Sequence, residues 1–131
     1  MQVRDVMTVG VVCVKPTCSL KAAREQLTLH RIHHLLVKDE DRLVGVLSYH
    51  HFIGGSDQRT VAEVMSRDVV TLTPTDTLRN AASRLLGRSH GCAAVLNGSA
   101  VSGVVTTTDL LHAISTGTSR QRVHAGSPSR L

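Results

Sequence analysis

Aromatic side chains are almost absent from this chain. Its 131 residues include no tryptophan, one tyrosine (Tyr49) and one phenylalanine (Phe52), although 41% of the residues are hydrophobic. A core must therefore be built from valine, leucine, isoleucine and alanine, which favours strands and closely packed small-residue helices over an aromatic-lined groove. The length suits one globular domain, or two small units that depend on each other.

Signals for export, membrane insertion and disulfide bonding are also missing. Arg4 and Asp5 interrupt the first apolar residues before a signal peptide could form. No apolar run approaches the roughly 18 residues that a membrane span requires. The three cysteines, Cys13, Cys18 and Cys92, have no framework spacing, so we expect a reducing, cytoplasmic environment.

The positive charge is concentrated near the C-terminus. The formal net charge is +5, from 15 Lys and Arg against 10 Asp and Glu, and Arg120, Arg122 and Arg130 supply three of the positive charges. The rest of the chain shows neither the basic stripe nor the aromatic stacking platforms that nucleic-acid binders use. Neither a nucleic acid nor a membrane is therefore expected as a partner.

The sequence repeats itself after 58 residues without an insertion. Residues 3–53 align with residues 61–111, with 13 identities over 51 positions. Two copies with so long a period do not suit a solenoid, and predict two half-domains related by a pseudo-twofold axis. The identical pairs are Val3/Val61, Val6/Val64, Met7/Met65, Val11/Val69, Val12/Val70, Pro16/Pro74, Thr17/Thr75, Leu20/Leu78, Ala23/Ala81, Leu27/Leu85, Val37/Val95, Gly45/Gly103 and Val46/Val104.

Each copy predicts the same five elements. A short β-branched run, VVCV or VVTL, ends at a proline, and an amphipathic helix follows with apolar residues at i, i+3 and i+7. Two further strands flank a turn, DEDR in the first copy and NGS in the second. A closing helix starts after Ser48 or Thr106. The predicted fold class is therefore α/β (α+β), with tandem β-α-β-β-α repeats.

This duplicated unit resembles the CBS-domain pair, or Bateman module, of the family named after cystathionine β-synthase. The resemblance rests on the lead-ins VRDVMT and VAEVMS, and on the segments IHHLLVKDEDRLVGVLS and GCAAVLNGSAVSGVVTTTDLL. It implies a first repeat over residues 1–56 and a second over residues 57–117. Residues 118–131 have no apolar periodicity, which predicts a basic, flexible tail.

The resemblance also implies a regulatory role. Many members of this family bind adenosine-containing ligands in clefts between the repeats, and pairs commonly associate with one another. We therefore expect a non-enzymatic sensor of AMP, ADP, ATP or S-adenosylmethionine, without a required cofactor, that forms a homodimer and signals to a protein target. The sequence itself contains no activated-nucleophile signature, P-loop or dinucleotide glycine motif.

The family's nucleotide motif, Gly-h-h-Thr/Ser-x-x-Asp/Asn, is complete only in the second copy. There the resemblance assigns Thr106 to the phosphate and Asp109 to the ribose hydroxyls, and a helix N-terminus does attract phosphate. The first copy has Ser48 but places His51 at the ribose position, and a neutral imidazole offers a single acceptor nitrogen. One usable nucleotide cleft per chain is therefore expected.

Four more residues are predicted to complete this cleft. His33 and His34 lie in a stretch resembling the Ile-His-Arg-Leu-Pro-Val pattern of nucleotide-sensing members, so the resemblance implies that they reach the phosphates. Val69 and Val70 belong to the first strand of the second copy, and we expect them to contact the adenine.

Plainer interpretations stay open. A hydroxyl residue followed three positions later by an acid is also a helix-capping pattern, and the module would then serve as a ligand-free dimerisation or docking unit. Cys13 and Cys18 could form a redox pair, but Cys13 is predicted to lie in a buried strand, where thiols are inert. A metal-binding sensor would use histidines with Cys13 or Cys92, although no CxxC or HExxH spacing is present. Those histidines are His30, His33, His34, His50, His51 and His90.

Overall fold

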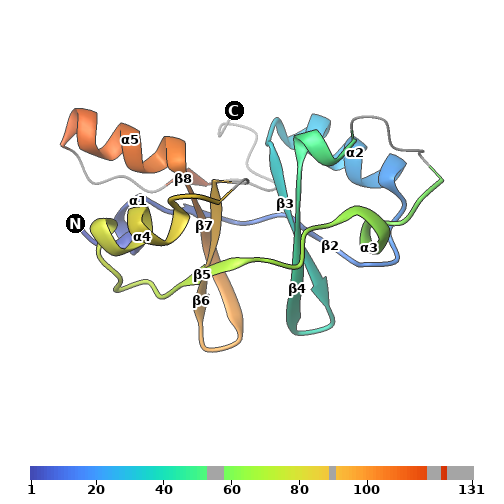
Figure 1. Cartoon of the computed structure of the whole chain (residues 1–131), viewed down its shortest axis with the longest axis horizontal. Helices are drawn as coiled ribbons and strands as arrows, with labels where there is room; N and C mark the ends of the chain where they lie inside the picture. The colour runs from blue at the N-terminus through green and yellow to red at the C-terminus, as the bar shows by residue number, and fades with distance from the viewer. Residues whose placement is uncertain (53–57, 89–90, 118–121, 124–131) are drawn as a thin grey trace. The chain divides into compact units, whose positions relative to one another are not determined.

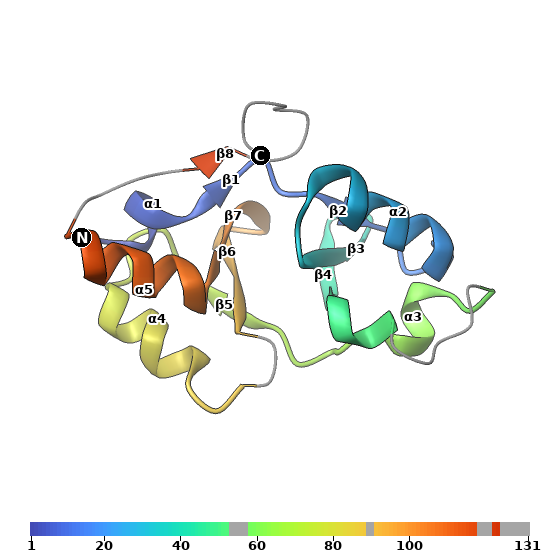
Figure 2. The ribbon, with the colours of Figure 1, turned by 90° about the horizontal axis from the view of Figure 1, so that it is seen from above.

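The structure is a computed structural model that describes residues 1–52, 58–88, 91–117 and 122–123. The chain forms two compact units (Figures 1 and 2). Unit 1 combines Met1–Val11 with the described residues from Val70 onward, and unit 2 spans Val12–Val69.

Unit 1 is a five-stranded sheet with helices packed on it. The helices α4 (Leu78–Leu85) and α5 (Thr107–Thr116) lie side by side in both views, and the short α1 (Val3–Val6) contacts α5 and β7 (Figures 1 and 2). Apolar faces of helices and sheet meet in one core, which includes Val3, Val6, Ala81, Leu85, Val95, Val105, Leu110 and Ala113. The strand order is β5 (Val70–Leu72), β6 (Cys92–Asn97), β7 (Ala100–Thr106), β1 (Thr8–Val9) and β8 (Arg122–Val123).

Unit 2 repeats this plan around a smaller sheet. Its strands are ordered β2 (Cys13–Val14), β3 (His34–Asp39) and β4 (Arg42–Ser48). The helices are α2 (Leu20–His30), the 3₁₀ helix η1 (Tyr49–Phe52) and the short α3 (Val61–Val64). Their apolar side chains form a second core of Leu20, Ala23, Leu27, Ile32, Leu35, Val37, Leu47 and Val61.

The predicted order strand, helix, strand, strand is confirmed in both copies. The first helix of each copy begins at an equivalent hydroxyl cap, because Ser19 Oγ accepts the Ala22 N–H at 3.1 Å and Thr77 Oγ1 accepts the Asn80 N–H at 3.0 Å. The closing element differs between the copies. The second copy has the ten-residue α5, which ends at Gly117 with φ 66°, whereas the described part of the first copy has the 3₁₀ helix η1.

Two details differ from the sequence-based expectation. Cys13 is exposed rather than buried, because β2 is a two-residue strand at the edge of its sheet. Within the predicted tail, Arg122 and Val123 form β8, which pairs in parallel with β1, and the rest of that tail lies outside the described residues. Over the described segments, no helix is long and apolar enough to cross a membrane.

The lead-in of each repeat packs with the body of the other repeat. In unit 1 the Val3 N–H donates to the Asp76 carbonyl at 2.8 Å, and in unit 2 the Val61 N–H donates to the Cys18 carbonyl at 2.8 Å. The two hydrogen bonds are equivalent under the 58-residue shift. Val3 and Val61 are both fully buried, so each lead-in is part of a core. The compact units are therefore built across the sequence repeats, whose predicted boundaries stay a prediction.

A glycine in each copy allows this lead-in to approach the sheet. A Cβ on Gly103 would lie 2.7 Å from the Thr8 carbonyl oxygen and 2.8 Å from Met7 Sδ. A Cβ on Gly45 would lie 2.5 Å from Met65 Sδ. Real Cβ atoms essentially never come within 3.0 Å of another heavy atom, so the repeated spacing of Gly and Met in the two copies follows from packing between the lead-in and the strand.

Replacing Gly103 by alanine should therefore destabilise unit 1. We expect Gly103→Ala to lower the free energy of unfolding by about 1–3 kcal/mol, as overpacking does in other closely packed sites. Ser102→Ala, the neighbouring position on β7, is the matched control and should change stability by less than about 0.5 kcal/mol. Urea unfolding followed by circular dichroism measures both, and equal losses would contradict the packing role of Gly103.

The exchange of lead-ins predicts which half of the chain is the better folding unit. Residues 12–69 carry α3 with the body that buries it, whereas residues 1–58 carry α1 and lack Val61. The two fragments have equal length, and we expect the fragment 12–69 to unfold at the higher temperature. Thermal unfolding by circular dichroism gives the comparison, and a more stable 1–58 fragment would contradict the exchange.

Candidate functional site

The start of α5 is a capping box made by Thr106 and Asp109. Thr106 is the N-cap residue, with φ −110° and ψ 164°, and its Oγ1 accepts the Asp109 N–H at 3.1 Å. In return, Asp109 Oδ2 accepts the Thr106 N–H at 2.9 Å. These two bonds satisfy backbone donors that a helix N-terminus leaves without partners. The plain capping interpretation of this pair is thus present in the structure.

The Asp109 carboxylate is buried beside a thiol. Only 7% of Asp109 is exposed, and Thr106 faces Cys92 across the β6–β7 ladder. Burial, and secondarily the negative charge of Asp109, raises the pKa of the Cys92 thiol to about 12. Cys92 therefore stays protonated at neutral pH and is a poor nucleophile, because the thiolate is the reactive form.

The first copy has the same arrangement with an imidazole in place of the carboxylate. His51 Nδ1 accepts the Ser48 N–H at 2.9 Å, and Ser48 Oγ lies 3.4 Å from the same nitrogen. A neutral imidazole has one acceptor nitrogen, and here the backbone occupies it. A carboxylate has two oxygens with about four acceptor positions. The difference between the copies is therefore one of acceptor capacity.

A second pair of equivalent bonds ties the closing element to the residue before the middle strand. The Thr107 N–H donates to the Gly91 carbonyl at 2.9 Å, and the Tyr49 N–H donates to the His33 carbonyl at 3.0 Å. Gly91 has φ 60°, and a Cβ there would lie 2.9 Å from Thr107 Oγ1. The second copy therefore has a glycine, without a side chain, at the position where the first copy has His33. Sequence reasoning missed the roles of Gly91 and Tyr49.

Three of the predicted site residues belong to unit 1. Thr106 and Asp109 are brought together by their mutual hydrogen bonds. Val70 begins β5, and its side chain is 4% exposed within the core of the unit. Thr106 is half-buried.

The other three predicted site residues belong to unit 2. His33 is exposed just before β3, and His34, the first residue of β3, is half-buried. Val69 is half-buried at the last position of the unit. The predicted nucleotide cleft would need residues of both units, and it stays a prediction.

The metal hypothesis finds no support in the part of the chain that the structure describes. Within it, no three His, Cys, Asp or Glu side chains come together in a way that could hold a metal ion. His90 and the side chain of His50 lie outside the described residues.

The raised pKa of Cys92 predicts an alkaline loss of stability. The unfolded thiol ionises near its ordinary value of 9.0 and the folded thiol near 12, so the stabilisation is full below pH 9 and is lost as the pH rises toward 12. Cys92→Ala should remove this contribution, at most about 1.4 kcal/mol per pH unit. Urea unfolding of both proteins from pH 7 to 11 is the measurement, and parallel pH curves would contradict the assignment.

Comparison with known proteins identifies the family. The CBS domain model matches residues 3–55 and again residues 61–116. Among curated proteins, the chain is 30% identical over 118 residues to the uncharacterized protein MJ1232 of Methanocaldococcus jannaschii. It is 27% identical over 124 residues to an A-adding tRNA nucleotidyltransferase of Geobacter sulfurreducens. These matches cover 88% of this chain in both cases, but only 40% and 14% of the two relatives, so the chain corresponds to a part of each.

Solved structures share the fold. The CBS domain pair of protein MJ0100, in complex with 5′-methylthioadenosine and S-adenosyl-L-methionine, has a TM-score of 0.82 and 21% identity, covering 90% of this chain and 98% of that one. CBSX2 in complex with AMP has a TM-score of 0.74 and 24% identity, covering 88% and 96%. With matches to the family model over residues 3–55 and 61–116 and a fold shared with these pairs, the chain belongs to the CBS domain family and carries two tandem CBS repeats.

Proposed function

We propose that this chain is a regulatory module that binds an adenosine-containing ligand, such as AMP or S-adenosylmethionine, at the start of α5. The observation that carries the proposal is the contrast between the two capping pairs. Thr106 with Asp109 combines a hydroxyl and a carboxylate at the N-terminus of a ten-residue helix, while Ser48 with His51 uses the single acceptor of its imidazole for the backbone.

The chemistry of this helix start suits a nucleotide. The Thr106 hydroxyl can donate to a phosphate oxygen while its lone pair accepts the Asp109 N–H, and the helix dipole favours the negative charge. The carboxylate of Asp109 can accept both hydroxyls of a ribose. Support also comes from relatives of the same fold, whose solved structures contain AMP in CBSX2 and methylthioadenosine with S-adenosylmethionine in MJ0100.

The remaining parts of the proposed site come from the sequence argument. His33, which is exposed, and His34, which is half-buried, are proposed as phosphate contacts on the sequence resemblance alone. Val69 is the better candidate for adenine contact, because Val70 is packed inside a core. Ligand binding would favour one of two arrangements of a homodimer, and a protein target would recognise that arrangement. The module itself would carry out no reaction.

A ligand-free docking module is the second candidate. It is favoured by one observation, which is that the Thr106–Asp109 capping box is complete without any ligand. Under this alternative the chain would dimerise or dock through its surface, and nucleotides would have no effect.

Isothermal titration with AMP, ADP, ATP and S-adenosylmethionine tests the proposal. We expect at least one of them to bind the wild-type chain and Asp109→Asn to weaken that binding about tenfold or more, because a hydrogen bond to a charged group contributes about 1.5–3 kcal/mol. Asparagine keeps an oxygen that can accept the Thr106 N–H, so the cap survives.

His51→Asn is the matched control. It likewise keeps an acceptor for the Ser48 N–H, and it should change the affinity less than twofold. Comparable losses in both variants would show that Asp109 has no special role. Absence of heat with all four compounds at millimolar concentration would favour the docking module.

A further inference from the structure

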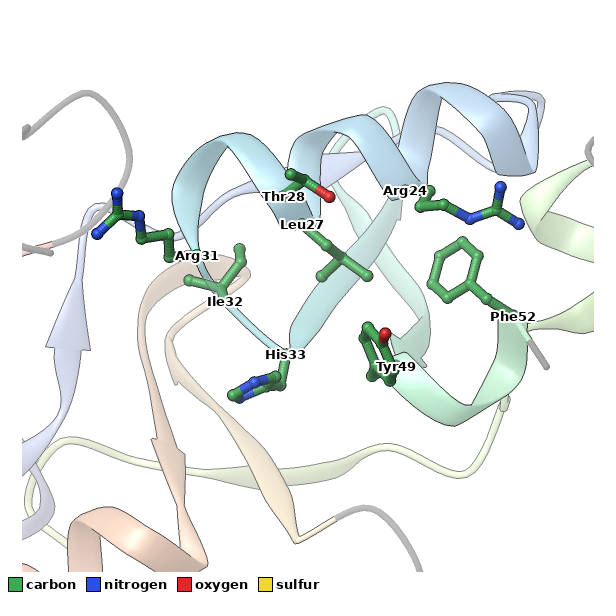
Figure 3. Close-up of a pocket in the computed structure, with 8 residues that line it drawn as sticks. All are labelled: Arg24, Leu27, Thr28, Arg31, Ile32, His33, Tyr49 and Phe52. Carbon is green, nitrogen blue, oxygen red and sulfur yellow. The ribbon is translucent and has the colours of Figure 1, made fainter.

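The two units differ at their surfaces, although both follow one plan. In unit 2, α2 and η1 form a pocket in which the Arg24 guanidinium carbon lies 5.6 Å from the centroid of the Phe52 ring (Figure 3). His33 lines this pocket and already belongs to the proposed ligand site. Unit 1 is distinguished at its sheet, where β8 covers the outer edge of β1 (Figure 2). The proposed ligand site does not involve this edge.

The backbone polar groups of Val9 face β8. Thr8 pairs with β7 in antiparallel register. In the equivalent pair of unit 2, the Val46 N–H donates to the Ser66 carbonyl at 2.9 Å, and the Ser66 N–H donates to the Val46 carbonyl at 3.0 Å. A Cβ on Gly103 would lie 2.7 Å from the Thr8 carbonyl oxygen, so this carbonyl is directed toward β7. Since successive residues of a strand form hydrogen bonds toward opposite edges, the N–H and carbonyl of Val9 are directed toward β8.

β8 occupies this edge as a parallel strand. Arg122 lies opposite Thr8, and Val123 lies opposite Val9. Pairing of this kind uses backbone N–H and carbonyl groups, which every residue except proline carries. An open strand edge is therefore a template for any extended segment, and proteins bind peptides in this way by strand addition. The edge of β1 recognises the extended backbone of the segment that covers it.

The equivalent edge of unit 2 is built to resist strand pairing. Arg67 and Asp68, both exposed, stand where unit 1 has Val9 and Gly10. Charged side chains discourage pairing at an edge, whereas valine is favoured in strands. The Asp68 N–H also donates locally, to Ser66 Oγ at 3.3 Å. Among the described residues of unit 2, no strand covers this edge. The fold therefore does not require a covering strand here, and Val9 marks an edge that accepts one.

We propose that the outer edge of β1 is a docking site for an extended segment of a partner protein, and that β8 competes for this edge from within the chain. Residues 117–121 connect β8 to α5, and so short a tether gives β8 a local concentration in the millimolar range. The identical segment of a second copy lacks this advantage, so the competing segment has to come from a different protein. Only two residue pairs hold β8, which allows a longer segment to displace it.

A peptide with the sequence of residues 118–127 is the probe, because it contains the segment that fits this edge. Its target is the full chain with Arg122→Pro and Val123→Pro, which removes both N–H groups of β8 and opens the edge. We expect this open variant to bind the peptide with a dissociation constant of about 1 mM or lower. The wild-type chain should bind it roughly tenfold more weakly, as for a site that is free about a tenth of the time. Chemical-shift changes of the Thr8 and Val9 amides measure the binding.

Three controls separate backbone pairing from attraction of a basic peptide. The same peptide with N-methylated amides at Arg122 and Val123 keeps its charge and should not bind the open variant. Ser127→Pro with Ser129→Pro changes the predicted tail outside β8 and should leave the weak binding of the wild-type chain unchanged. Val9→Arg, made in the open variant, copies the residue of the unit 2 edge and should abolish binding. Circular dichroism shows whether the Val9→Arg variant is folded.

Four outcomes would overturn the proposal. The first is no binding of the peptide to the open variant. The second is equal affinity of the open variant and the wild-type chain, which would mean that β8 does not compete. The third is equal binding of the N-methylated peptide, which would mean attraction by charge. The fourth is a wild-type dimer, seen by light scattering, that the open variant loses, which would mean that β8 joins two copies. The expected results hold whether or not a nucleotide binds at the start of α5.

Discussion

A backbone N–H at the end of a strand needs an acceptor, and both repeats supply it from a side chain three residues further on. Asp109 accepts the Thr106 N–H and His51 accepts the Ser48 N–H, at the same distance of 2.9 Å. This bond fixes where each closing element begins, and with it the direction of the side chains that follow. Because both residue types satisfy the backbone, the fold tolerates either one. The backbone bond therefore does not determine which of the two side chains stands at this position.

The two cores also depend on the exchange of lead-ins between the repeats. Each core contains a valine from a segment that precedes the other repeat, and Gly45 and Gly103 give those segments room to approach. Neither body buries its own lead-in, so a change in one lead-in affects the body of the other repeat. The helix α5 packs on the core of unit 1, where Leu110 and Val3 are both buried. The position of α5 therefore depends on a residue that is distant from it in the sequence.

Much of this could be predicted from the sequence, for identifiable reasons. The repeat, the main strands and the helices α2, α4 and α5 follow from apolar periodicity and from caps such as Ser19 and Thr77. The capping pair at Thr106 was visible because its spacing is local. The exposure of Cys13 was not, because an apolar run does not reveal that its strand lies at an edge. The exchange of lead-ins and the contact between Arg24 and the Phe52 ring could not be predicted from the sequence either. Both depend on tertiary packing, which no local sequence pattern encodes.

The exchanged lead-ins also constrain how such a chain can arise. A polypeptide with one repeat could complete this kind of core only if the lead-in of a second molecule packed against it, as in a domain-swapped dimer. When two repeats are joined in one chain, the contact between a lead-in and the other repeat becomes intramolecular. Its effective concentration is then set by the short connection and not by the amount of protein in solution. The duplication therefore makes the folding of the pair independent of protein concentration.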